Sequence, residues 1–441
     1  MTEEFEEKIL EELKPTEEII GSVEDAVEDM YEELDEINEK NDYNYEPELV
    51  GSVAKGTFLR NPDIDMFIKF PRDVPRSDME RIALHVGREL LNKPEERYAE
   101  HPYIHGRYKG FKSDIVPCYE LAEGEGLITS VDRTPLHTEY IIENLSEDEK
   151  DEVVLLKGFL KGIGAYSAET KVRGFSGYLC ELLVHHYGSF KDVLEESQSW
   201  KIGERIELID SDRQFDEPLV VIDPTDSERN VASALSEENM TYFIYAAKRY
   251  LDEPDRKFFF PDDIEEKKAD ELVYDYKDRG THLVGVRLPR PDVVEDNLYP
   301  QVQKAKRNLV KQLEDKGFVV FHSKYYIAED ELILIFELEQ EKLPKIEKHM
   351  GPPIWSGHTE SFREKYGSEV YIEDGRLKVD RKRKYVHVRD VIEYTARNIN
   401  LGSRITPMIP EKMEIYDGEK VIEKYPEFVN KFFDRRFPWE R

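Results

Sequence analysis

The spacing of apolar residues changes from a helical to a strand-like period within the first 70 residues. Apolar residues from Ile19 to Ile37 recur every three or four positions behind Thr16, which predicts a capped amphipathic helix. From Asp63 to Phe70, apolar and polar residues alternate, as they do in a strand with one buried face. Asp63 and Asp65 are therefore expected on the same, polar face of that strand.

The same patterns predict the elements that surround this strand. We expect a second strand beside it at residues 111–120, a helix at 77–91 that joins the two, and a polar and aromatic loop at 101–108. Further helices are predicted at 138–144, 148–163 and 179–187. The stretch Asp223-Pro224-Thr225-Asp226 is expected to cap one more helix, which carries Arg229.

The last part of the chain has a different organisation. An acidic, linker-like zone at 254–270 precedes a strand, a helix and two strands, at 283–288, 297–316, 319–327 and 331–339. That order indicates a compact α+β module. A hairpin is expected around Asp374-Gly375.

Composition and charge narrow the class of protein. The 441 residues are too many for one ordinary hydrophobic core, so several domains are expected. No secretory signal and no apolar run long enough to span a bilayer is visible, so we expect a soluble, cytoplasmic protein without a membrane partner. Cys118 and Cys180 lie in apolar stretches, which argues against a disulfide scaffold or a zinc cluster.

The acidic net charge has to be weighed against one basic segment. A net charge of −33, averaged over the chain, argues against a nucleic-acid partner. RNA affinity depends on local groups of Lys and Arg, however, and residues 376–389 (RLKVDRKRKYVHVR) form such a group. This segment is either a solvated hairpin edge or an RNA contact, and both interpretations stay open.

The paired aspartates are the first candidates for chemistry. Two neighbouring carboxylates repel each other unless a cation lies between them, and hard oxygen ligands suit Mg²⁺. Asp114, in the second predicted strand, is a candidate third carboxylate for a two-metal site. The alternative is that Asp63-x-Asp65 lies on a solvated strand and binds nothing.

A glycine-serine step precedes the paired aspartates. Gly51-Ser52 follows a short apolar run, and Lys55, Gly56 and Thr57 come soon after. A strand that breaks at glycine and enters a helix offers backbone N–H groups and a hydroxyl to a phosphate. The P-loop pattern is absent, because no Gly-Lys-Ser/Thr follows at the required spacing. The stretch predicts a phosphate-binding segment beside the candidate metal site.

Gly51-Ser52, Asp63-x-Asp65 and the later Asp114 together resemble the nucleotidyltransferase superfamily of DNA polymerase beta type. More closely, the chain is similar to the archaeal, class I CCA-adding enzymes, the tRNA nucleotidyltransferases. The similarity extends over essentially the whole chain. It is carried by GSVAKGT, DIDMF, HPYIHG, DIVPCY, RTPLHTEYI, LLKGFLKGIGAYSAE, GFSGYLCELL, DPTDSERNVASAL and MGPPIW.

This resemblance implies both a fold and an activity. The fold is α+β and multidomain, with a polymerase-beta-type nucleotidyltransferase head (residues 1–145), a helical central domain (146–262) and a C-terminal α+β RNA-binding domain (263–441). The activity is the addition of C, C and A to the 3′ end of tRNA from CTP and ATP, by two-metal-ion transfer without a nucleic-acid template and with release of pyrophosphate. The implied partner is tRNA, held at its acceptor stem and T-arm, and a homodimer is compatible with the resemblance.

The resemblance also assigns roles to individual residues. Asp63, Asp65 and Asp114 would be catalytic and would hold two Mg²⁺ ions. Ser52 and Lys55 would bind the triphosphate, although Lys55 lacks the bidentate geometry of the arginine that some relatives have there. The full set expected to contact the nucleotide is Ser52, Lys55, His137, Lys157, Tyr166 and Arg229. Of these, Arg229 would help to read the base, together with the backbone of the tRNA.

Two other functions remain as alternatives. The chain is then either another RNA nucleotidyltransferase, such as a poly(A) polymerase or a 2′-5′ oligoadenylate synthetase, or a non-catalytic RNA-binding protein. Only a CCA-adding enzyme stops after a defined C, C and A, so the sequence of the product separates the enzymes. The three aspartates argue against a loss of catalysis, because a binding protein has no need for three repelling carboxylates at one site.

Overall fold

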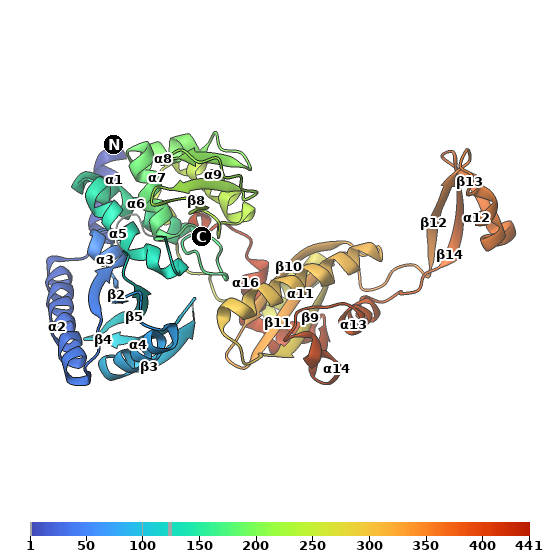
Figure 1. Cartoon of the computed structure of the whole chain (residues 1–441). Helices are drawn as coiled ribbons and strands as arrows, with labels where there is room; N and C mark the ends of the chain where they lie inside the picture. Colours follow the sequence, from blue (N-terminus) through green and yellow to red (C-terminus); the bar gives the residue numbers. More distant parts are fainter. Residues whose placement is uncertain (1, 99, 122–125) are drawn as a thin grey trace. The chain divides into compact units, whose positions relative to one another are not determined.

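The computed structural model describes residues 2–98, 100–121 and 126–441 (Figure 1). The chain forms two compact units, one of residues 1–263 with Arg436–Arg441 and the other of Ile264–Arg435. The boundary between them falls inside the acidic zone at 254–270. No helix in the described part of the chain is long and apolar enough to cross a membrane.

The first unit is built on a five-stranded mixed sheet. In spatial order its strands are β1 (Glu46–Val50), β2 (Asp63–Phe70), β5 (Phe111–Tyr119), β4 (Pro102–Tyr108) and β3 (Asn92–Tyr98). β2 and β5 run parallel, whereas all other neighbours are antiparallel. The two predicted adjacent strands are thus confirmed, and their register sets Asp65 directly opposite Asp114.

The two faces of β2 differ as the alternating pattern predicts. Four of its five apolar residues, Ile64, Met66, Ile68 and Phe70, are completely buried in one core with α2 (Glu17–Asn41) and α4 (Arg76–Leu90). The Thr16 hydroxyl caps α2 by accepting a hydrogen bond from the Ile19 N–H at 3.4 Å. The opposite face of β2 carries Asp63 and Asp65, followed by Phe67, which packs with Val50 and Cys118, and by Lys69.

The prediction of a loop at residues 101–108 is wrong, because this segment forms β4. It pairs with β3 on one side and β5 on the other. Its residues alternate between buried and more exposed positions, which is the period of a strand. Polar and aromatic side chains on its more exposed face hid this period in the sequence. The correction matters because β4 sets His105 opposite Asp114.

Helices and a small three-stranded sheet complete the first unit. A reciprocal cap of Ser146 and Glu149 opens α6 (Glu147–Ile163), which packs on α7 (Gly177–Tyr187). The other elements are α1 (Thr2–Leu13), α3 (Gly51–Lys55), α5 (Arg133–Asn144), α8 (Phe190–Ser197), α9 (Glu237–Asp252), β6 (Glu204–Glu207), β7 (Leu219–Asp223) and β8 (Asp226–Asn230). The Phe159 ring is completely buried in the main core of this unit, against the rings of Phe243 and Tyr250.

The prediction that residues 223–226 cap a helix is wrong. They form the turn between β7 and β8, and Arg229 lies on a strand. The Asp223 carboxylate accepts hydrogen bonds from the backbone N–H and the hydroxyl of Thr225, at 3.0 and 2.8 Å. An aspartate that bonds two residues ahead stabilises a turn as well as a helix start, so the local sequence could not separate the two.

The second unit contains the predicted strand-helix-strand-strand module. Its elements are β9 (His282–Pro289), α11 (Glu295–Asp315), β10 (Val320–Ile327) and β11 (Glu331–Leu338), which confirms the predicted order. A fourth strand, β15 (Glu414–Asp417), completes an antiparallel sheet of order β10-β11-β9-β15. The apolar residues of α11 pack into the core of this sheet.

A separate sheet in the same unit carries the basic segment. It consists of β12 (Ile346–Pro353), β14 (Arg376–Lys382) and β13 (Val370–Glu373), and the predicted turn at Asp374-Gly375 joins its last two strands. The remaining helices are α10 (Ala269–Arg279), α12 (Thr359–Tyr366), α13 (Val388–Asn398), α14 (Ile409–Lys412), α15 (Glu419–Lys424) and α16 (Pro426–Phe433).

The last six residues of the chain belong to the first unit. The Trp439 ring stacks on Phe258, with ring centroids 4.9 Å apart, and on Phe437, at 4.8 Å. The chain therefore passes between the two units twice, after residue 263 and after residue 435.

Candidate active site

Asp63, Asp65 and Asp114 lie on adjacent strands of the five-stranded sheet. Burial raises the pKa of Asp65 to about 7, helped by repulsion from Asp114 and Asp63 and opposed by Lys55. Burial also raises the pKa of Asp114, and there His105 opposes it. A divalent cation among these carboxylates would remove the repulsion, so the donor chemistry fits a hard metal ion.

The side chains of Asp63, Asp65 and Asp114 are not arranged as a complete set of metal ligands in this structure. Within the described ranges, no three His, Cys, Asp or Glu side chains already converge as metal ligands. Asp63 is the most exposed of the three, since it stands at the start of β2.

His105 is a site residue that the sequence analysis did not assign. Its Nδ1 lies 2.6 Å from Oδ1 of Asp114, and its side chain is mostly buried. The bond fixes the orientation of the Asp114 carboxylate. The signal in the sequence was the alternation within residues 102–108, which makes the segment a strand.

Gly51 brings the predicted phosphate-binding segment against the aspartates. Its φ of +74° is left-handed, and a Cβ on this residue would lie 2.3 Å from Oδ2 of Asp65. The position therefore needs glycine on two counts, backbone conformation and space. The predicted break from strand to helix is confirmed, because β1 ends at Val50 and the short α3 begins at Gly51. Ser52 and Lys55 lie on α3.

Glu181 gathers two of the predicted cationic residues in a buried cluster. Its Oε2 accepts a hydrogen bond from Lys55 Nζ, and its Oε1 accepts one from Lys157 Nζ, both at 2.8 Å. Lys157 also donates to the Thr57 hydroxyl and to the Thr57 carbonyl, at 2.9 and 3.1 Å. Burial would raise the pKa of Glu181, but Lys157 and Lys55 lower it to about 2.

Asp223 gathers the other polar candidates. Its Oδ2 accepts hydrogen bonds from His137 Nε2 at 2.8 Å and from Arg229 Nη1 at 2.6 Å. An ionised carboxylate can only accept, so the His137 ring must donate here. Burial lowers the pKa of His137, although Asp223 opposes the shift. The Tyr178 hydroxyl donates to Oδ1 of the same carboxylate at 3.2 Å.

Tyr178 connects the two clusters. Its ring stacks on His137 with centroids 4.0 Å apart, and Lys55 Nζ lies 5.1 Å from the centroid of the Tyr178 ring. The structure thus joins Lys55, Lys157, His137 and Arg229 into one polar network anchored by Glu181 and Asp223.

Tyr166 lies near this network on a short bridge to Phe175. Burial raises the pKa of the Tyr166 phenol to about 12, so the group stays protonated at neutral pH. The Tyr166 hydroxyl and the Lys157 side chain both approach Gly177. The Nζ of Lys161 lies 5.4 Å from the Tyr166 ring centroid, which leaves a cation and an aromatic face together.

The anchoring carboxylates were missed by the sequence analysis. Glu181 interrupts the apolar run of GYLCELLV, and a lone acid in a core helix was the available signal. Asp223 closes the apolar strand β7 in the same way. On α6, Lys157 is buried, whereas Lys161, one helical turn further along, is exposed.

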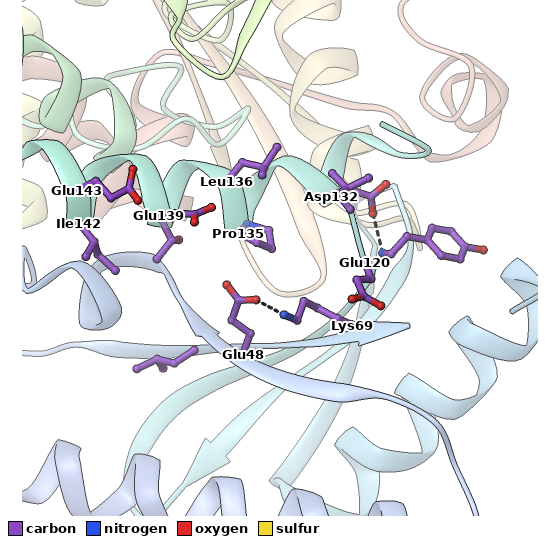
Figure 2. Close-up of a pocket in the computed structure, with 13 residues that line it drawn as sticks. Glu48, Lys69, Glu120, Asp132, Pro135, Leu136, Glu139, Ile142 and Glu143 are labelled. Carbon is purple, nitrogen blue, oxygen red and sulfur yellow. Dashed lines mark hydrogen bonds and ion pairs between the residues drawn. The ribbon is translucent and has the colours of Figure 1, made fainter. Parts of the chain in front are cut away.

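A pocket of about 480 Å³ lies beside this site, between α5 and the edge of the sheet (Figure 2). Glu48 and Lys69, paired at 2.8 Å, face Glu139 and Glu143 across it. Among the described residues that line the pocket, five are acidic and one is lysine, and none is among the nine predicted for the site. Such a lining repels a triphosphate, so the nucleotide is not expected there.

Three family models match the chain in succession. They are a nucleotidyltransferase domain at residues 31–137, the second domain of tRNA nucleotidyltransferase at 151–260 and the C-terminal domain of CCA-adding enzyme at 279–418. The chain is 37% identical over 427 residues to the CCA-adding enzyme of Methanocaldococcus jannaschii, and the match covers 92% of this chain and 94% of the relative. The chain belongs to the CCA-adding enzymes.

Other CCA-adding enzymes match to a similar degree. That of Methanosarcina barkeri is 39% identical over 381 residues, which cover 84% of each chain. That of Methanothermobacter thermautotrophicus is 36% identical over 449 aligned positions, which cover 98% of each chain. The predicted family and fold class, a multidomain α+β protein with a nucleotidyltransferase head, are thereby confirmed.

Proposed function

We propose that this chain adds C, C and A in turn to the 3′ end of tRNA from CTP and ATP, without a nucleic-acid template. The observation that carries the proposal is the register of Asp65 against Asp114, with Gly51 packed on the Asp65 carboxylate. Membership of the CCA-adding enzymes supports the choice of tRNA, CTP and ATP as substrates.

In the proposed reaction, the 3′-hydroxyl oxygen of the tRNA attacks the α-phosphorus of the nucleotide. A new phosphorus–oxygen bond forms, the bond from the α-phosphorus to the oxygen that bridges it to the β-phosphate breaks, pyrophosphate leaves, and the hydroxyl proton is released to water. Asp63, Asp65 and Asp114 would hold two Mg²⁺ ions, which when bound lower the pKa of the attacking hydroxyl and offset charge on the triphosphate. His105 holds the Asp114 carboxylate in one orientation for this task.

The nucleotide is proposed to lie across the polar network. Ser52 and Lys55 bind its triphosphate, because Lys55 donates to Glu181 and as an ammonium has further N–H groups to offer. Lys157 already donates to three acceptors, so it contacts a phosphate only by exchanging one of them. His137, Tyr166 and Arg229 form the remaining part of the nucleotide site.

The second unit is proposed to bind the tRNA. Its basic segment at 376–389 and the α+β module suit phosphate and shape contacts along the acceptor stem and T-arm. In this account residues 1–145 carry the chemistry, 146–262 complete the nucleotide site and 263–441 hold the tRNA. A cytoplasmic place of action and a homodimer stay predictions.

The proposal is tested by changing Asp65 to Asn. The substitution keeps the size of the side chain and removes the charge that would bind the metal, so incorporation of labelled CTP into tRNA lacking its CCA end should fall at least ~1,000-fold. Binding of tRNA should stay within ~3-fold of wild type, because phosphate contacts elsewhere supply that affinity. The control is Asp73→Asn, at an exposed position outside the site. Undiminished incorporation by D65N would contradict the proposal.

A further inference from the structure

Asp223 is a completely buried carboxylate with an unusually full set of donors. Four residues supply five hydrogen bonds to its two oxygens: His137, Tyr178, Arg229 and, twice, Thr225. Burial would raise the pKa of Asp223, but these bonds hold it well below its usual range. The group is thus a fixed negative charge inside the first unit, and the side chains around it are oriented by it.

Arg229 is a member of this group that is still partly exposed to solvent. Its side chain is 31% exposed, and Nη1 is held 2.6 Å from Asp223 Oδ2. Nη1 also lies 3.5 Å from His137 Nε2, and within the described part of the chain Nε and Nη2 of Arg229 donate no hydrogen bond. Because a guanidinium is a rigid plane of five N–H groups, holding one corner fixes the direction of the others.

The Asp223 cluster is continuous with the catalytic segment. His137 precedes Thr138 on α5, and the Thr138 hydroxyl accepts a hydrogen bond of 3.4 Å from the Gly51 N–H. Tyr178 stacks on His137 and lies beside Lys55. Arg229 is therefore anchored in the same network that reaches the glycine beside Asp65.

We propose that Asp223 is a positioning residue that sets the base specificity of this enzyme, by clamping the Arg229 guanidinium in one orientation. The inference rests on the proposed function and on the expectation that Arg229 faces the base. In this inference Asp223 helps the enzyme to reject U and G. That role is separate from any contribution of Asp223 to the stability of the fold.

The chemistry of the bases explains why a clamp is needed. Cytosine and adenine both carry an amino group beside an unprotonated ring nitrogen, whereas uracil and guanine carry a carbonyl oxygen beside a ring N–H. A fixed N–H donor pairs with the ring nitrogen of C or A, and it opposes the ring N–H of U or G. A loose guanidinium would turn toward the carbonyl oxygen of U or G instead, so discrimination depends on its being held.

The test compares kcat/KM for CTP and for UTP on a tRNA that lacks its CCA end. Asp223→Asn keeps the size of the side chain but weakens the bond to Arg229, and the CTP-to-UTP ratio should fall about tenfold or more. Arg229→Lys keeps the charge but loses the rigid plane, and it should lower the ratio similarly. The double variant should lower it no further, because both changes break one interaction.

Thr225→Val is the matched control. It removes a hydrogen bond of 2.8 Å to the other oxygen of Asp223 and leaves the bond to Arg229 in place. The CTP-to-UTP ratio of this variant should stay within about threefold of wild type.

The proposal is overturned if D223N lowers kcat/KM for CTP and UTP by the same factor, since Asp223 would then act on folding alone. If D223N does not fold, R229K decides, and an unchanged ratio in R229K overturns the clamp. Failure of the proposed function is a different result, because the wild-type protein would then add neither C nor A. A failed clamp leaves wild-type addition intact.

Discussion

Replacing Gly51 with alanine tests whether its close approach to Asp65 matters for activity. The added Cβ would lie 2.3 Å from Asp65 Oδ2, about 1 Å nearer than the 3.4 Å at which ordinary contact begins. Either the carboxylate or α3 has to move by that amount. A displacement of about 1 Å at reacting groups costs on the order of 100-fold in rate. We therefore expect G51A to lower kcat for CTP addition ~100-fold.

A neighbouring glycine supplies the control for backbone strain. Gly51 and Gly56 have nearly the same left-handed φ, +74° and +73°, so alanine should destabilise both by about 1–2 kcal/mol. At Gly56, however, the nearest atom to an added Cβ is the Lys150 Cδ, 3.5 Å away, which is an ordinary contact. G56A should therefore share the loss of stability and keep most of the activity.

The assay measures thermal unfolding and single-turnover CTP addition for both variants beside wild type. The account predicts similar melting temperatures for G51A and G56A and a difference in rate between them of about 30-fold or more. Equal rates in two equally folded variants would refute the reasoning, because the contact with Asp65 would then have no catalytic consequence.

Three further predictions concern stability. Glu181→Gln leaves two buried ammonium groups without their counter-charge, so it should destabilise the protein by about 3–5 kcal/mol in denaturant unfolding. A loss below ~1 kcal/mol would show that the cluster is not essential for stability. Trp439→Ala removes a stacked aromatic ring and should lower the free energy of unfolding by about 3–5 kcal/mol. The control Trp355→Ala, at a residue 82% exposed, should lower it by less than ~0.5 kcal/mol. Equal losses in the two variants would contradict the packing of Trp439. Burial, helped by Arg435, lowers the pKa of His322 to about 4. Between about pH 6.5 and 4 the unfolded chain therefore binds more protons than the folded one, so the stability of the fold falls as the pH drops through that window. His322→Phe should make the fall in melting temperature shallower, and an identical fall would contradict the assignment.

The sequence predicted those features of the site that depend on local periodicity. The alternation of apolar and polar residues predicted β2 and predicted that Asp63 and Asp65 share one face. Gly51 indicated where the strand ends and α3 begins. The strand β4 was missed because its more exposed face is polar and aromatic, so His105 could not be connected with Asp114. The hairpin at Asp223 was missed because an aspartate before a turn and one before a helix make the same local hydrogen bonds.

The anchors of the site were beyond local reasoning for a different reason. Glu181 binds Lys55 from 126 positions along the chain, and Asp223 binds His137 from 86 positions away. No local spacing reports such a pair, and only the packing of α3, α5, α7 and β7 brings the partners together. An acid inside an apolar run remains the one sequence signal for them, because an unpaired buried charge is too costly to keep.

The central claim, defined addition of C, C and A, is tested most directly by sequencing product ends. The protein and Mg²⁺ are incubated with tRNA that ends at the discriminator base, with CTP alone, ATP alone or both, and the 3′ ends are sequenced. The account predicts C, C with CTP alone and a complete C, C, A with both nucleotides. Long A tails from ATP, or no addition alongside tight tRNA binding, would contradict it, in favour of a poly(A) polymerase or of a non-catalytic RNA-binding protein.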